Sequence, residues 1–350
     1  MFVNCKLVNI NYCFKYNLYY SKIMNNCGPD PVFVLRGATS SVTAVSFLLP
    51  PEGDKVYKIA AGTQDGRLLI WNLKTKCVVQ EWSANCSSSI QWIYSEAAQQ
   101  LWTHQRHGYV QLWDLTFPSP EVKVQFDISD YLGFSQSHLT ILDNGSRLLA
   151  IPGPGQEGVS VWDVDSNYKI CSLLPPHTTN RGSLMQARYV KVARKVALVV
   201  AYESGHISLW NWNEKNIMSE VDVNESPICL TYDDESRMGI IGTTSEKVYI
   251  FNISSNLIIS VVKHLFITNG GVSSCVVRLD GKIFVTGGWD SRVRIFSAKR
   301  YKPLAVLQYH KKTVECLAYS TSDVEHFGCG LLLAAGSSDN SISLWNIFNS

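Results

Sequence analysis

The chain repeats one short pattern seven times, and this repetition limits its possible folds more than any other property of the sequence. Each copy ends an alternating run, such as "RVRIF" or "HISLW", on an aromatic residue. Consecutive aromatics lie 41 to 49 residues apart. The seven positions are Trp71, Trp113, Trp162, Trp210, Phe251, Phe296 and Trp345. A period of this length is typical of proteins in which each repeat forms one small unit that packs against its neighbours.

The pattern within each copy predicts strands. Small residues and glycine end a first strand, and Asp-Gly, Ser-Gly or Asp-Asn supplies a tight turn. The alternating run then predicts a second strand with one apolar side. A further apolar segment, such as "VTAVSF" or "PICLTY", precedes each pair, and helical periodicity is absent almost everywhere. About four short strands per copy predict an all-β fold, a seven-bladed β-propeller over residues 32–350.

These repeats resemble the WD40 family from about residue 33 to residue 348. The Trp-Asp pair of that family occurs as Trp113-Asp114 and Trp162-Asp163. Its turn aspartate, six residues before the aromatic, occurs as Asp65, Asp290 and Asp339. Its histidine at the blade entrance is matched clearly by His310 and less well by His264. The resemblance implies that these residues are structural, and that few blades carry the family's complete set of buried hydrogen bonds.

The two ends of the chain predict how the ring closes. The segment "VFVLRG", Val32 to Gly37, has no partner strands before it and resembles the outermost strand of a blade. Pairing it with the last blade would close the ring and remove its open edges. The first 23 residues match nothing in the repeats and lack an apolar signal core. We expect residues 1–31 to form a disordered extension, with Met24 as an alternative natural start.

Trp289 does not fit the repeat as a structural residue. In "TGGWDSRVRIF", Phe296 takes the core position and Asp290 the turn position, so Trp289 is an additional aromatic in a turn. The family resemblance places this turn on the face around the central channel. A large exposed aromatic is unfavourable unless it packs or binds, so we expect either a partner contact or packing on a neighbouring loop. The equivalent residues of the other copies are Gln64, Arg106, Gly155, Glu203, Thr244 and Ser338. This mixed ring suits a protein or peptide partner.

Several function classes are disfavoured. A net charge of +2 and the absence of an 18-residue apolar run argue against a nucleic-acid or membrane binder. The ten cysteines form no C-x-x-C motif, and His104 and His107 are expected at the surface, so we expect no metal and no cofactor. "GPGQEG", Gly153 to Gly158, matches G-x-G-x-x-G, but a predicted strand follows it where a dinucleotide site needs a helix. No catalytic motif is found, so we expect no enzyme.

Four segments, "PDPVFVLRG", "GWDSRVRIF", "PLAVLQYH" and "LLAAGSSDNSISLW", are similar to the G protein β-like branch of the WD40 family and to the fungal ASTRA-associated proteins. This resemblance implies a monomeric scaffold within a larger complex. It further implies an adaptor of the co-chaperone machinery that matures phosphatidylinositol-3-kinase-related kinases, linked to DNA-damage signalling and chromatin and present in cytoplasm and nucleus.

Two alternatives remain. A heterotrimeric G protein β subunit needs a long N-terminal helix, but residues 1–31 contain no heptads, and Pro29 and Pro31 would interrupt a helix. A chromatin reader needs an aromatic or acidic cage, to which Trp289, Tyr202 and Glu203 would contribute.

Overall fold

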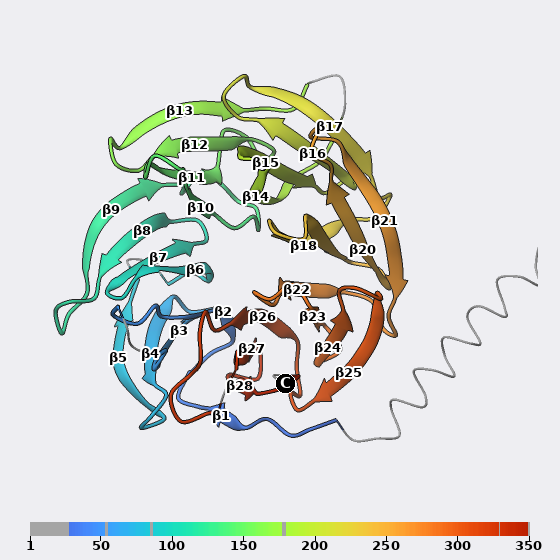
Figure 1. Cartoon of the computed structure of the whole chain (residues 1–350). Helices are drawn as coiled ribbons and strands as arrows, with labels where there is room; N and C mark the ends of the chain where they lie inside the picture. The colour runs from blue at the N-terminus through green and yellow to red at the C-terminus, as the bar shows by residue number, and fades with distance from the viewer. Residues whose placement is uncertain (1–27, 53–54, 85–86, 177–179, 329, 349–350) are drawn as a thin grey trace, which may run out of the picture.

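The strands form seven four-stranded antiparallel sheets arranged as blades around a central channel, so the fold is the predicted β-propeller (Figure 1). This computed structural model describes residues 28–52, 55–84, 87–176, 180–328 and 330–348. Within these residues there are 28 strands and no helix. Most of the extension predicted for residues 1–31 lies outside the described residues, which begin at Gly28.

Blades 1 to 6 each use four strands that are consecutive in the chain, with the innermost strand first. Blade 1 comprises β2 (Val42–Phe47), β3 (Lys58–Thr63), β4 (Arg67–Asn72) and β5 (Cys77–Ser83), and blade 2 comprises β6 (Ile90–Ala97), β7 (Gln100–Gln105), β8 (Tyr109–Asp114) and β9 (Glu121–Asp127). Blade 3 comprises β10 (His138–Ile141), β11 (Arg147–Pro152), β12 (Val159–Asp163) and β13 (Tyr168–Leu173), and blade 4 comprises β14 (Leu184–Val192), β15 (Lys195–Tyr202), β16 (His206–Asn211) and β17 (Asn216–Asp222). Blade 5 comprises β18 (Pro227–Asp233), β19 (Met238–Thr243), β20 (Lys247–Ile253) and β21 (Ile259–Phe266), and blade 6 comprises β22 (Val272–Val277), β23 (Ile283–Gly288), β24 (Arg292–Ser297) and β25 (Lys302–Gln308).

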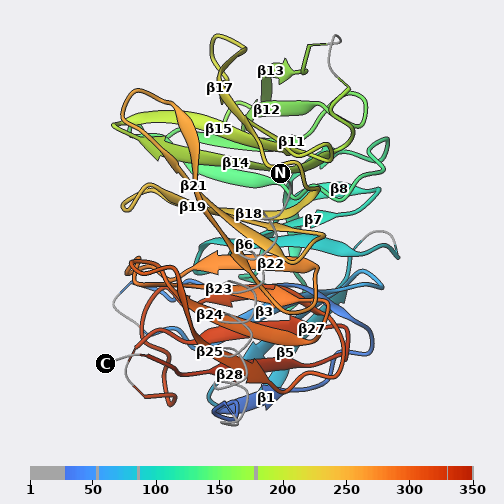
Figure 2. The ribbon, with the colours of Figure 1, turned by 90° about the vertical axis from the view of Figure 1, so that its right-hand side faces the viewer.

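Blade 7 joins both ends of the described chain. Its inner strands are β26 (Val314–Tyr319), β27 (Leu333–Ser337) and β28 (Ile342–Trp345), and its outermost strand is β1 (Phe33–Leu35). Figures 1 and 2 both show β1 against β28. The Val32 N–H also donates to the Leu344 carbonyl at 2.8 Å. The predicted closure of the ring by an N-terminal strand is therefore confirmed.

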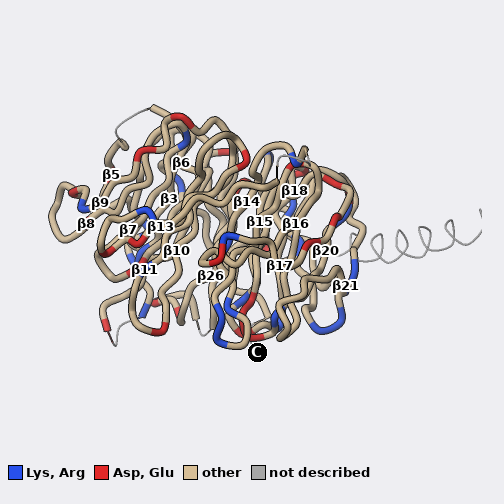
Figure 3. Tube along the Cα trace, turned by 90° about the horizontal axis from the view of Figure 1, so that it is seen from above, with Lys and Arg blue, Asp and Glu red and all other residues tan. Residues whose placement is uncertain are grey.

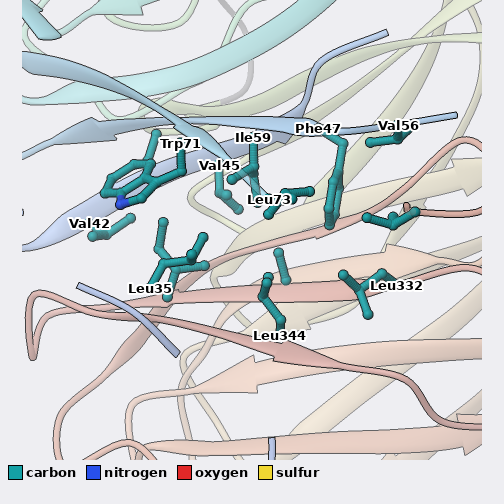
Figure 4. Packing of buried hydrophobic residues seen from close by; sticks show 14 of the residues in the cluster. Leu35, Val42, Val45, Phe47, Val56, Ile59, Trp71, Leu73, Leu332 and Leu344 are labelled. Carbon is teal, nitrogen blue, oxygen red and sulfur yellow. The ribbon is translucent and has the colours of Figure 1, made fainter. Parts of the chain in front are cut away.

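The side chain of Leu35 seals the junction between the last blade and the first. It is almost fully buried in a cluster with Val42 and Trp71 of blade 1 and Leu344 of blade 7 (Figure 4). The Trp71 indole N–H donates to the Arg36 carbonyl at 3.0 Å. Burial of this many apolar groups from segments far apart in the sequence is the main driving force that holds the ring closed.

A second contact joins the same two blades through their loops. Val56, in the loop after β2, forms a parallel bridge with Val324, in the loop after β26, and both side chains are buried. The Val56 N–H donates to the Asp323 carbonyl and its own carbonyl accepts from the Glu325 N–H. The first and last blades are therefore joined by loops as well as by β1.

The aromatic position predicted for each repeat is a core position in the structure. Six of the seven side chains are buried, and Trp162 of blade 3 is half-buried. In blades 1 to 6 the register of the third and fourth strands shifts immediately before this residue. Such an irregularity bends a strand and increases its twist, so the aromatic fills the wedge between neighbouring blades.

Blade 7 alone carries the complete polar network expected from the family. The Trp345 indole N–H donates to Ser343 Oγ at 2.7 Å, and Ser343 Oγ contacts His310 Nε2 at 2.7 Å. His310 Nδ1 in turn lies 3.0 Å from Asp339. Burial disfavours the charged form of Asp339, but hydrogen bonds, including those from Ser341 and His310, hold the pKa of this carboxyl below its usual value.

Blade 6 replaces this network with an ion pair. Arg294 takes the position of the blade 7 serine, two residues before the core aromatic, and its side chain is almost fully buried. Its guanidinium donates to both carboxylate oxygens of Asp290, at 3.0 and 2.5 Å, and to the Thr268 carbonyl. The weaker match, His264, is wrong as an entrance histidine, because it lies exposed within β21 beside Tyr249 and Phe266.

Candidate protein-binding face around the channel

The channel through the ring is a cavity with a volume of ≈ 1020 Å³. Its walls are the innermost strands, because every blade presents its first strand to the axis. The turns between the second and third strands of the blades gather at one end of it. Five of the seven turn residues predicted to form a ring line this cavity, namely Gln64, Arg106, Thr244, Trp289 and Ser338.

One backbone hydrogen bond recurs at these turns. In six blades the N–H of the turn residue donates to a carbonyl in the segment that enters the same blade, at 2.8 to 3.0 Å. The six pairs are Gln64–Ser41, Arg106–Ser89, Glu203–Ser183, Thr244–Ser226, Trp289–Gly271 and Ser338–Thr313. The shared bond shows that the alignment of the repeats identified equivalent positions in the fold.

Two of the predicted ring residues lie outside the channel lining. Gly155 belongs to "GPGQEG", which forms a turn between β11 and β12, and its surroundings are open. Glu203 points away from the cavity, where its carboxylate accepts the Ser183 N–H at 3.1 Å. Tyr202, the third member of the possible reader cage, is 1% exposed. These positions do not bring a cage together with Trp289.

Trp289 packs against a neighbouring turn, and part of its side chain stays exposed and could contact a partner. Its indole ring lies over Gly271, where an added Cβ would come within 2.1 Å of the ring. Gly271 also has φ +90°, so glycine is needed there for its backbone as well as for space. The Trp289 side chain is nevertheless 50% exposed. A ring held flat on backbone with its other face open loses little conformational entropy on binding.

A second apolar group at the channel mouth could not be predicted from the repeat pattern. The loop between blades 2 and 3 exposes Leu132 (57%) and Phe134 (62%), and Phe134 lines the channel. The Arg106 guanidinium lies 3.9 Å from the centre of the Phe134 ring and donates to the Leu132 carbonyl at 3.2 Å. The only signal in the sequence was two large apolar residues in the polar segment "SDYLGFSQS".

Hydrogen bonds of Tyr131 and Ser137 hold this loop in place. The Tyr131 hydroxyl donates to the Leu184 carbonyl and accepts the Ser135 N–H, and burial raises the pKa of Tyr131 to about 12. The Ser137 N–H donates to His104 Nδ1 at 3.1 Å. His104 is fully buried, so its predicted surface position is wrong, and burial lowers the pKa of its ring to about 3. The exposed side chains therefore project from an ordered support.

The described residues give little support for a metal site or a membrane-spanning helix. They contain no group of three or more His, Cys, Asp and Glu side chains arranged to hold a metal ion. No helix in this part of the chain is long and apolar enough to cross a membrane. In the view of Figure 3, acidic and basic residues are interspersed along the chain.

Comparison with known families agrees with this geometry. The family model described as "WD domain, G-beta repeat" matches residues 29–72, 256–297 and 301–346. Together with the seven blades, the closing N-terminal strand and the blade 7 network, these matches identify WD40 repeats within a seven-bladed β-propeller, an architecture that points to a non-catalytic scaffold.

Individual proteins resemble it over most of their length. The chain is 29% identical over 324 residues to the mouse (Mus musculus) guanine nucleotide-binding protein subunit beta-like protein 1, covering 91% of this chain and 97% of that protein. It is 26% identical to ASTRA-associated protein 1 of Schizosaccharomyces japonicus, covering 91% and 99%. The protein of the same name from Schizosaccharomyces pombe is 23% identical, with the same coverage.

Proposed function

We propose that this propeller is an adaptor that binds partner proteins through the face at the channel mouth, within an ASTRA-like complex. Its partners are the co-chaperones and the large phosphatidylinositol-3-kinase-related kinases that they mature. The protein works in both cytoplasm and nucleus. It contributes binding surface and orientation, and the chemistry belongs to the kinases.

One observation carries this proposal: two large aromatic side chains, Trp289 and Phe134, stand at least half exposed at the same channel mouth. Exposed aromatics on rigid supports are the residues that most often dominate binding energy at protein interfaces. The packing of Trp289 over Gly271, and of Phe134 against Arg106, fixes both rings before a partner arrives.

The kind of partner is supported by the relatives. The names of the fungal proteins place them with ASTRA, and the mouse relative, although named for G protein β subunits, matches the same span of this chain. A cage for a modified histone tail is less well supported, because Tyr202 is buried away from the mouth.

The test is affinity purification with mass spectrometry from the organism's own cells, comparing wild type with the double variant Trp289→Ala/Phe134→Ala. Each truncation of a central aromatic typically weakens an interface by more than about 2 kcal/mol, so co-chaperone and kinase peptides should fall at least tenfold. Since both side chains are half-exposed, the melting temperature should change by less than about 2 °C.

The matched control is Phe266→Ala. Phe266 is 48% exposed, but it lies on β21, the outer edge of blade 5. This control should keep its partners. If the double variant keeps them while the control loses them, the binding face is the blade edge. If wild type retains no such kinases or co-chaperones, the adaptor role itself is wrong.

A further inference from the structure

The channel wall carries an arginine that forms no ion pair with the described residues. Arg188 lies in the middle of β14, the innermost strand of blade 4, and lines the cavity. Its guanidinium forms neither an ion pair nor a hydrogen bond with any residue in the described ranges. Guanidinium groups removed from bulk water are usually paired, because an unpaired buried charge is unfavourable.

The other charged groups that line the channel are already engaged. Arg106 donates to a loop carbonyl and lies over an aromatic ring. Glu315 accepts a hydrogen bond from Ser338 Oγ at 2.5 Å, and Asp233 accepts a backbone N–H of its own turn at 2.9 Å. Arg188 is thus the charged group of the described lining that remains free to bind a ligand.

The acid that acts most strongly on Arg188 does not neutralise it by contact. Asp234 follows the end of β18, and its carboxylate accepts the backbone N–H of Lys191 at 2.8 Å. Burial raises the pKa of Asp234, and burial lowers the pKa of Arg188 despite the attraction of Asp234. The two groups attract each other, but no ion pair or hydrogen bond joins them in the described structure.

A second hydrogen-bond donor lines the same cavity as Arg188. Tyr94 of β6, in blade 2, lines the same cavity, is 37% exposed and stacks on Trp92 with ring centres 5.9 Å apart. Its hydroxyl makes no hydrogen bond with the described residues. Burial and Glu96 raise the pKa of Tyr94, and the positive charge of Arg188 opposes this shift.

We propose that the channel is a binding site for an oxyanion, a carboxylate or phosphate group, held by Arg188 and Tyr94. A guanidinium offers two parallel N–H donors that match the oxygens of either group, and a hydroxyl adds a third. The cavity of ≈ 1020 Å³ has the size of a small-molecule site, and it can also receive an extended acidic segment. Both sources present the same chemistry, and the site does not depend on the adaptor role.

The test measures the melting temperature of the full chain against inorganic phosphate, with chloride at equal ionic strength as the reference. A ligand that binds only the folded state raises the melting temperature with its concentration, which gives an apparent dissociation constant. Arg188→Met should weaken phosphate binding about tenfold or more, because it removes a charge-assisted contact. Arg67→Met, which removes a paired arginine on β4, should bind like wild type.

Two further variants and a second probe separate the possible outcomes. Tyr94→Phe keeps the stack on Trp92 and should weaken binding a few-fold. Arg188→Met should fold well, because it removes a charge that forms no ion pair, and its melting temperature in chloride checks this. The second probe is the end-blocked peptide GGEGG, with GGQGG as its neutral control.

Stabilisation of wild type by phosphate but not by the peptide would identify a small free anion as the ligand. Stabilisation by GGEGG and not by GGQGG would identify an acidic segment of a partner. In both cases Arg188→Met must abolish most of the effect. If neither probe stabilises wild type, or if Arg188→Met responds like wild type, the channel is not an oxyanion site.

Discussion

Acidification to pH 5 should destabilise the propeller through His104, and the size of the loss follows from its burial. His104 Nδ1 accepts the Ser137 N–H, so this nitrogen cannot carry a proton without breaking that bond. Burial lowers the pKa of His104 from 6.5 to about 3. The unfolded chain therefore takes up a proton as the pH falls below about 6.5, while the folded protein does not. Stability is complete above that pH and falls as the pH drops toward 3.

At pH 5 the expected loss is about 2 kcal/mol, because about 1.5 pH units of the unfolded-state titration have been crossed at about 1.4 kcal/mol each. The assay is urea unfolding at pH 7.5 and pH 5.0, followed by tryptophan fluorescence. His104→Gln keeps an acceptor for the Ser137 N–H but does not titrate, so its loss should be smaller than that of wild type by about 2 kcal/mol. Equal losses in the two proteins would refute the reasoning, because other titrating groups are common to both.

Further predictions concern the closing strand and the buried ion pair. Leu35→Ala should cost about 2–5 kcal/mol by chemical denaturation, as for other buried leucines, whereas Leu174→Ala, at a 43% exposed site, should cost less than about 0.5 kcal/mol. If the Leu35→Ala substitution changed the unfolding of only one blade and left the rest of the protein as stable as wild type, the ring would not unfold as a single closed unit. Asp290→Ala should cost about 3–5 kcal/mol, because it leaves the guanidinium of Arg294 buried and unpaired. The double variant Asp290→Ala/Arg294→Met should recover most of that loss, and additive losses in a double-mutant cycle would argue against the ion pair.

The repeat pattern predicted the parts of the fold that depend on local sequence. In six of the seven copies, the turn residue seven positions before the aromatic occupies an equivalent place in its blade, as the recurrent turn hydrogen bond shows. The pairing of β1 with β28 was also predictable, because a ring with one incomplete blade and one unpaired strand has a single way to close. The two-residue alternation of apolar side chains predicts the strands, and the repeat of about 45 residues predicts the blades.

The features that the sequence did not predict depend on contacts between segments that the repeat does not relate. Phe134 lies in a connection outside the repeated strands, and only the anchoring of Tyr131 and Ser137 shows which of its neighbours project outward. His104 is a polar residue in the polar stretch "THQRH", but β7 is buried on both faces from Leu101 to Gln105, and His104 contacts Ser137 of a packed loop. Arg188 looks like an ordinary polar residue of a strand until the ring turns that strand toward the channel.

The closure of the ring has a consequence for how the chain is made. Asn340 and Thr39, which hydrogen-bond across the junction, are 301 residues apart in the sequence. The first blades can assemble while the ribosome is still producing the rest, but the last sheet cannot be completed until its final strand has been synthesised. Until then β1 has no partner strand, and an unpaired strand edge of this kind is prone to intermolecular association. Non-local pairings of this range also fold slowly, so newly made molecules pass through an open ring whose lifetime sets how much of the protein reaches the closed state.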